Sequence, residues 1–198
     1  MMYDYRRMTP EERREVVRER HARGFPLHAP PHFRGVIGDY LITAACFEHR
    51  PVFAQPADLS WLLDETVNTF IEAEIPCRAW VFLPNHYHVV LHTEDMGIMS
   101  EILRLLHSRV ATEINGRHHR RGRRVWYRFS DRLIRSERHH WATVNYLHYN
   151  PVKHGYVDRM MAWPWSSIHE YLADRGEDEV LRMWRDYPVG DYGRGWDW

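Results

Sequence analysis

The chain has 198 residues, and its 27 Lys and Arg balance its 27 Asp and Glu, so the formal net charge is zero with its 15 His neutral. Apolar residues make up 44% of the sequence, which excludes a disordered or fibrous protein and suffices for one compact domain. No apolar run approaches the roughly 18 residues of a membrane span, and the charged amino terminus lacks the apolar segment of a secretory signal. We therefore expect a cytoplasmic protein with no membrane partner.

The first predicted element is a surface helix. Thr9 can cap it, Pro10 suits its first turn, and Glu12 completes a capping box. It is expected to run to about Arg23 and to be followed by an extended linker over 26–31. Residues 1–37 are therefore predicted to form an N-terminal helical arm with a Pro-rich linker.

Alternating aromatic and aliphatic runs predict the strands of a sheet. They lie at about 40–47, 78–83, 86–92 and 125–134. Apolar residues near a 3.6-residue period predict helices over 59–71 and 99–114, and Ser136 can cap a third helix. That helix is expected to end at Asn150, because Pro151 disfavours helical geometry in the residue before it.

The order of these elements predicts an α+β fold. Strand, helix, strand, strand, helix, strand and helix suggest a ferredoxin-like or RRM-like antiparallel sheet with helices packed on it. Residues 38–157 are expected to form the main domain, and the Trp-rich tail, 158–198, to pack on it. The tryptophans of the tail are interpreted as packing anchors.

Two local patterns could carry chemistry. His86 and His88 alternate along a strand, so both imidazoles share one face and could chelate a divalent ion. Tyr146 and Asn150 are spaced i, i+4, so a phenol and an amide oxygen share one helix face. Each pattern alone is also typical of an ordinary structural role: a polar sheet face with histidines, and a structural tyrosine with a capping asparagine.

A third pattern is a basic segment. From Arg117 to Arg124 the sequence reads Arg-His-His-Arg-Arg-Gly-Arg-Arg, without an acidic residue. Such a segment could grip a nucleic-acid backbone, with Trp126 or Tyr127 available for stacking, although a solvated loop is an equally simple interpretation. The predicted DNA contacts are Arg117, Arg120, Arg121, Arg123 and Arg124, with Lys153 added from the segment after Tyr146.

In combination, the motifs resemble a known family. Leu-Pro-Asn-His-Tyr-His-Val-Val-Leu at 83–91 and Asn-Tyr-Leu-His-Tyr-Asn-Pro-Val-Lys-His-Gly at 145–155 are similar to the single-tyrosine HUH transposases, above all to the REP-associated tyrosine transposases. The similarity covers about residues 38–172. Tyr87 stands where the family usually has an aliphatic residue, and His107 stands where relatives often carry Lys.

The resemblance implies a function and a site. Tyr146 would be the nucleophile, and His86, His88 and Asn150 would bind a divalent metal, Mg²⁺ or Mn²⁺. The implied reaction is metal-dependent nicking and joining of single-stranded DNA through a 5′-phosphotyrosine, on palindromic repeats that form hairpins. A monomer is expected, with a dimer as the alternative.

Two other functions stay open at this point. The first is a catalytically silent DNA-binding module of the same fold. The second is a metal-dependent hydrolase of small phosphoesters, although such an enzyme usually has carboxylate ligands.

Overall fold

The computed structural model of the chain describes residues 9, 11–12, 14–15, 18 and 36–193. At its start the predicted capping box is present. The Thr9 amide donates to Glu12 Oε2 at 2.7 Å, and the Glu12 amide donates to Thr9 Oγ1 at 3.3 Å. The rest of the predicted arm and its linker lie outside the described residues, so the boundary at residue 37 stays a prediction.

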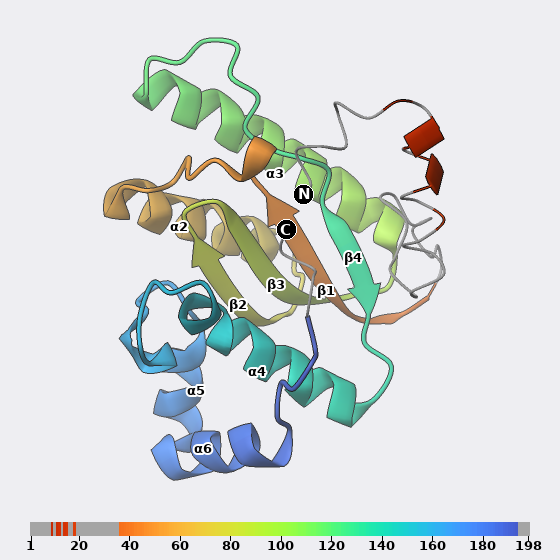
Figure 1. Ribbon diagram of the computed structural model, residues 1–198, viewed down its shortest axis with the longest axis vertical. Coiled ribbons are helices and arrows are strands. Elements are labelled where there is room, and N and C mark those ends of the chain that lie inside the picture. Colours follow the sequence, from red (N-terminus) through yellow and green to blue (C-terminus); the bar gives the residue numbers. More distant parts are fainter. Residues whose placement is uncertain (1–8, 10, 13, 16–17, 19–35, 194–198) are drawn as a thin grey trace.

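The centre of the molecule is a four-stranded antiparallel sheet (Figure 1). Its strands are β1 (Gly38–Ala45), β2 (Cys77–Leu83), β3 (His86–Thr93) and β4 (Ser130–Leu133), in the order β2-β3-β1-β4. β2 and β3 are joined by the tight Pro84-Asn85 turn, so β3 lies inside the sheet between β2 and β1. The predicted α+β class with an antiparallel sheet is confirmed.

Helices cover both faces of the sheet (Figure 1). On one side lie α2 (Pro56–Glu72) and α3 (Met96–Arg117), and on the other lies α4 (Glu137–Lys153). The buried residues of α3 recur every three or four positions, as expected for one helix face against a core. They are Met96, Met99, Leu103, Leu106, Val110 and Ile114.

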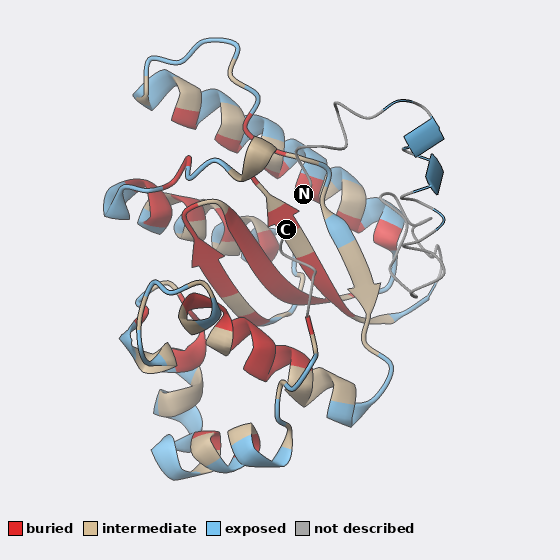
Figure 2. Cartoon of the chain, in the orientation of Figure 1, coloured by how far each residue is buried: buried red, intermediate tan, exposed pale blue. Residues whose placement is uncertain are grey.

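Strand alternation decides which side chains meet each helix layer. Ile42 pairs with Val89 and points toward α2 and α3, whereas Thr43 pairs with His88 and points toward α4. The inner strands are buried nearly throughout, as Figure 2 shows. Among the helices of the described part, none is both long and apolar enough to cross a membrane.

On the α3 side, the two residues that depart from the family pattern contact each other. The Tyr87 hydroxyl is 2.7 Å from His107 Nε2, and the His107 ring stacks on Trp126 at 4.7 Å between centroids. Burial lowers the pKa of His107 to about 4, so its neutral imidazole accepts the hydrogen bond from Tyr87. The departures at 87 and 107 therefore form one hydrogen-bonded pair.

Helix α4 begins as predicted and ends later. Ser136 Oγ accepts from the His139 amide at 3.1 Å, which confirms the cap. The predicted end at Asn150 is wrong, because α4 includes Pro151 and runs to Lys153. Because proline has no backbone N–H, Pro151 costs the helix one hydrogen bond, and the next turn still forms. The His154 amide donates to the Asn150 carbonyl at 3.0 Å. Gly155, with φ +73°, follows the helix.

Two further expectations need correction. The strand predicted over 125–134 is only Ser130–Leu133, because Val125 and Trp126 are buried in the core and Trp126 forms an isolated bridge with Cys46. The tail contains two helices that were not predicted from the sequence, α5 (Ile168–Arg175) and α6 (Glu177–Asp186), and a short 3₁₀ helix at Met160–Ala162. Another short 3₁₀ helix, Phe47–His49, follows β1. Both α5 and α6 are short, with eight and ten residues, and they lie in a segment that was predicted only as a tail packed on the domain.

The tryptophans of the described tail anchor it to the domain. Trp163 Nε1 donates to the Phe82 carbonyl at 2.8 Å, Trp165 Nε1 donates to Ser60 Oγ at 2.9 Å, and the Trp184 ring lies 5.2 Å from that of Tyr149. This agrees with their interpretation as packing residues. Trp196 and Trp198 lie outside the described residues.

Candidate active site

The two candidate metal ligands lie side by side near the start of β3. His86 and His88 are 3% and 0% exposed, and their ring centroids are 5.0 Å apart. The residue between them, Tyr87, points to the opposite face, as strand alternation requires. An inner strand of a sheet therefore holds both imidazoles rigidly against α4.

Helix α4 brings its tyrosine and its asparagine to these histidines. Asn150 Oδ1 is 3.1 Å from His86 Nε2, and the Tyr146 ring centroid is 5.3 Å from that of His88. Tyr146 and Asn150 are one helical turn apart, so each faces one histidine. The structure thus unites four side chains from segments more than fifty residues apart in the chain.

The outer ring nitrogens of both histidines have partners. Asn85 Oδ1 is 2.8 Å from His86 Nδ1, and Thr43 Oγ1 is 2.8 Å from His88 Nδ1. An amide oxygen can only accept, so His86 Nδ1 carries a proton. In the neutral form of this ring, the lone pair of Nε2 faces Asn150. Such bonds to the second nitrogen are typical of histidines that bind metals.

The facing atoms of His86 and Asn150 are suited to a cation. With His86 neutral and protonated at Nδ1, Nε2 and Asn150 Oδ1 can both donate lone pairs to one metal. Ligands about 2.1 Å from a metal and at right angles lie about 3.0 Å apart, close to the observed 3.1 Å. Within the described residues no group of three or more His, Cys, Asp or Glu could hold a metal. A metal at this place therefore needs the Asn150 amide beside the imidazoles.

Three further cationic or ionisable groups surround the candidate site. Lys153 Nζ lies 5.0 Å from the centroid of the Tyr146 ring, and the His154 ring lies 4.9 Å from that of His86. Burial lowers the pKa of the Arg132 guanidinium, and the neighbouring hydroxyls of Tyr192 and Tyr146 oppose that shift. No role was predicted for Arg132 or His154 from the sequence, although both lie in the part of the chain that resembles the family.

The end of the described chain covers the candidate nucleophile. Tyr146 is 1% exposed, and the Tyr192 ring packs on it at 5.5 Å between centroids. Tyr192 is held by Thr143 Oγ1 at 2.5 Å and His139 Nε2 at 3.0 Å, and Lys153 Nζ donates to the Gly193 carbonyl at 3.1 Å. A phosphate cannot reach Tyr146 unless this segment, residues 187–193, moves.

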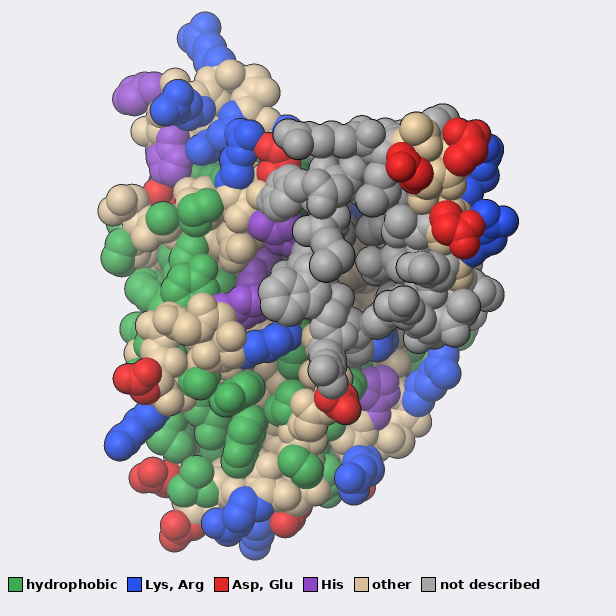
Figure 3. All heavy atoms as spheres, in the orientation of Figure 1, with side chains coloured by type: hydrophobic (Ala, Val, Ile, Leu, Met, Phe, Trp, Pro, Cys, Tyr) green, Lys and Arg blue, Asp and Glu red, His purple; other side chains and the backbone are tan. Residues whose placement is uncertain are grey.

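The basic segment lies elsewhere. It follows the end of α3, in the helix layer opposite α4 (Figure 1), and Lys and Arg side chains gather there in Figure 3. Some of its arginines have partners within the fold: Arg117 Nε donates to Glu113 Oε1, Arg123 Nε to Asn115 Oδ1 and Arg124 Nε to the Trp126 carbonyl. Arg120 and Arg121 are exposed. Of the predicted DNA contacts, the structure brings Lys153 to the candidate nucleophile, and it places the loop arginines in the other layer.

Known proteins share both sequence and fold with this chain. A protein of Haemophilus influenzae named as a REP-associated tyrosine transposase is 30% identical over 117 residues, which are 51% of this chain and 66% of that protein. A REP-associated tyrosine transposase of Escherichia coli is 32% identical over 99 residues, which are 48% of this chain and 56% of that protein. This chain is similar in sequence to the REP-associated tyrosine transposases. The match spans less than two thirds of either relative, and no family model matches the chain.

The fold of the REP-associated tyrosine transposases agrees. The solved structure of such a transposase bound to a REP hairpin aligns with a TM-score of 0.59 and 23% identity, over 75% of this chain and 86% of that one. The α+β fold and the family resemblance predicted from the sequence are therefore confirmed. The roles of individual residues are not tested by this similarity.

Proposed function

We propose that the protein nicks and joins single-stranded DNA in a metal-dependent reaction with Tyr146 as nucleophile. One observation carries the proposal: His86 Nε2 and Asn150 Oδ1 lie 3.1 Å apart, and beside them the Tyr146 ring packs on the His88 ring at 5.3 Å between centroids. A silent DNA-binding module would have no need of this arrangement. The similarity to tyrosine transposases supports the same reaction class.

His86, His88 and Asn150 are proposed to hold Mg²⁺ or Mn²⁺. Two imidazoles with one amide oxygen suit Mn²⁺ at least as well as Mg²⁺, which prefers oxygen ligands. When bound, the metal would polarise the scissile phosphate and withdraw charge as bonding at phosphorus changes. Asn85 and Thr43 orient the two rings by bonding their Nδ1 atoms, so that the Nε2 atoms face the site.

The proposed chemistry is a transesterification. The Tyr146 oxygen forms a bond to phosphorus while the bond from phosphorus to the 3′ oxygen breaks. The phenolic proton is transferred to the leaving 3′ oxygen, which becomes a 3′-hydroxyl, and the 5′ end remains on the protein as a phosphotyrosine. One ester replaces another, so the reverse reaction rejoins the strand without a further energy source. Lys153, beside the Tyr146 ring, is placed to offset negative charge as the phenol reacts.

The substrate is proposed to be a DNA hairpin with unpaired flanks. The scissile phosphate must be unpaired to reach a site between a sheet and a helix, and the matching solved transposase is bound to a REP hairpin. The exposed Arg120 and Arg121 are proposed to contact the hairpin backbone. A monomer suffices, because one chain supplies both the histidines and the tyrosine.

Covalent trapping tests the proposal. The protein is incubated with Mn²⁺ and a hairpin labelled on the 3′ side of the expected nick, and adducts are resolved by denaturing electrophoresis. Tyr146→Phe should abolish the adduct and keep hairpin binding, whereas Tyr149→Phe, three residues along the same helix, should keep both. Hairpin binding by the parent without an adduct would identify a silent module. Turnover of small phosphoesters without an adduct would identify a hydrolase.

A further inference from the structure

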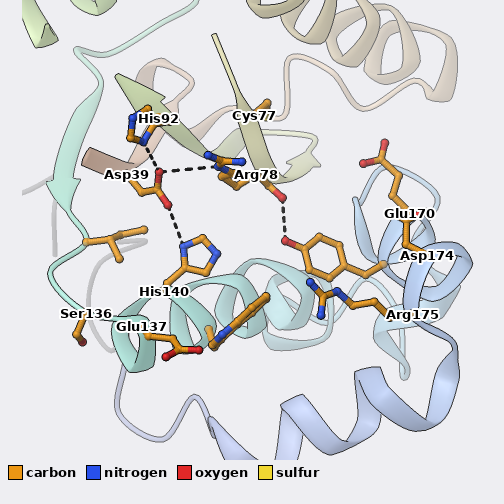
Figure 4. A pocket seen from close by; sticks show the side chains of 13 residues that line it. Asp39, Cys77, Arg78, His92, Ser136, Glu137, His140, Glu170, Asp174 and Arg175 are labelled. Atoms are coloured by element: carbon orange, nitrogen blue, oxygen red, sulfur yellow. Dashed lines mark hydrogen bonds and ion pairs between the residues drawn. The ribbon is translucent and has the colours of Figure 1, made fainter. Parts of the chain in front are cut away.

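A cavity separate from the candidate active site lies on the α4 side of the sheet. It measures about 820 Å³, within the range of small-molecule sites, and is open to solvent. Figure 4 shows that it lies between the beginning of α4, the sheet and α5. Its lining includes Asp39, Arg78, His140, Trp141, Tyr171 and Arg175.

The polar side of this cavity is organised around Asp39. Its Oδ1 is 2.8 Å from His92 Nδ1, and its Oδ2 is 3.1 Å from His140 Nδ1. Arg78 Nε is 3.9 Å from Oδ1, and the Arg78 side chain is 49% exposed (Figure 4). A carboxylate acceptor and a guanidinium donor thus stand next to each other at the cavity wall.

The opposite side of the cavity is aromatic. The Arg175 guanidinium lies 5.2 Å from the centroid of the Trp141 ring and 5.9 Å from that of Tyr171. The two rings are 6.5 Å apart and nearly perpendicular, at 88°. Both are only partly buried, and the Arg175 side chain is 40% exposed. Guanidinium and aromatic faces are the surfaces on which unpaired bases stack.

The cavity lies within reach of a strand bound at Tyr146. His140 precedes Tyr146 by six residues on α4, which is about 9 Å along the helix axis. Asp39 precedes Thr43, the partner of His88, by four residues on β1, which is about 13 Å along the strand. Asp39 and Thr43 point to the same face of the sheet, so the cavity and the candidate active site share one surface.

We propose that this cavity is a nucleotide subsite, which binds one unpaired nucleotide of single-stranded DNA near the scissile phosphate. The base stacks against Arg175 and Trp141, and its edge bonds to the carboxylate of Asp39 and the guanidinium of Arg78. Only the base is proposed to enter, with its phosphate outside, because Glu137, Glu170 and Asp174 also line the cavity and would repel a phosphate group. A base edge, in contrast, offers both donors and acceptors. This inference rests on the proposed function.

The test compares two DNA ligands by fluorescence anisotropy. One is a blunt hairpin, and the other has the same stem with unpaired extensions at both ends. The parent should bind the extended hairpin more tightly than the blunt one. Arg175→Ala and Arg78→Ala should each weaken binding of the extended hairpin about 5- to 100-fold, the usual range for a lost base contact, and leave binding of the blunt hairpin unchanged. Trp141→Phe keeps an aromatic ring at this position, so it should weaken binding of the extended hairpin less than either arginine variant does.

Arg104→Ala is the matched control. Arg104 is an exposed arginine on α3 paired with Glu101, and its side chain is 62% exposed. Its removal should change neither affinity. The subsite is refuted if the parent binds both hairpins equally, or if Arg175→Ala and Arg78→Ala bind the extended hairpin as the parent does. Failure of the parent to bind either hairpin would instead overturn the proposed function, and the subsite with it.

Discussion

The covering of Tyr146 by residues 187–193 has a measurable consequence. Because Tyr146 is 1% exposed, cleavage must be preceded by movement of this segment. The Tyr192 hydroxyl contacts Thr143 Oγ1 and His139 Nε2, and Tyr192→Phe removes both hydrogen bonds. At about 0.5–1.5 kcal/mol each, they contribute about 1–3 kcal/mol to the closed state. The equilibrium between closed and open states should therefore shift about 5- to 150-fold toward open.

The assay is single-turnover formation of the covalent DNA adduct at saturating protein and Mn²⁺. If opening precedes chemistry, the rate of Tyr192→Phe should rise by up to the same factor. Thr143 keeps its hydrogen bond to the His139 carbonyl at 2.7 Å, so the core of α4 should be undisturbed. Tyr187→Phe is the matched control, because Tyr187 is held to α4 through its backbone carbonyl, which accepts from Asn145 Nδ2 at 2.8 Å.

Gly193→Ala should act in the same direction as Tyr192→Phe. An added Cβ at Gly193 would lie 2.1 Å from Tyr146 Cε2, and φ of +75° disfavours any side chain, so the segment must leave its position. Adduct rates at or below the parent rate in both variants, with unchanged melting temperatures, would refute the idea that this segment limits access.

Three further outcomes are expected. Asn150→Asp should bind Mn²⁺ more tightly than the parent by titration calorimetry, because a carboxylate replaces an amide oxygen; unchanged affinity would argue against Asn150 as a ligand. Burial lowers the pKa of His107 to about 4, so the unfolded state binds more protons between pH 6.5 and 4 and stability must fall as the pH falls through this range. Urea unfolding at pH 6.5 and at pH 4 should show that His107 lowers the free energy of unfolding by on the order of 3 kcal/mol at the lower pH. The decrease should be smaller in His107→Gln, and an equal decrease in that variant would contradict a buried, neutral His107. Replacing both Arg120 and Arg121 with Ala should reduce the salt slope of hairpin binding by about two, whereas an unchanged slope would place the DNA elsewhere.

Much of the fold could be predicted because its signals are local. The inner strands alternate or are wholly apolar, and α2 and α3 have clear apolar faces, so their bounds are within a few residues of those predicted. The last helix was ended too early because the effect of Pro151 was judged from its neighbour alone, whereas a proline in a final turn costs a helix little. The strand predicted from Val125 failed because a buried aromatic run can equally anchor a loop.

The candidate site could be predicted only in part. Strand and helix spacing show that His86 and His88, or Tyr146 and Asn150, share a face, but not that the two faces meet. The family resemblance supplied that link, and the structure brings the four side chains together. Contacts from distant segments have no local signal. Tyr192 over Tyr146, Arg132 near it, and His154 beside His86 depend on packing that spacing does not reveal.

The hydrogen bond between Tyr87 and His107 limits which residues of its relatives this chain can accept at positions 87 and 107. An aliphatic residue at 87 alone would leave a buried imidazole nitrogen unsatisfied, and a Lys at 107 alone would bring an ammonium group against a buried phenol. Each single exchange should therefore destabilise the strand that carries His86 and His88. A chimaera that carries a relative's residues at both 87 and 107 should fold, so these two positions must be exchanged together.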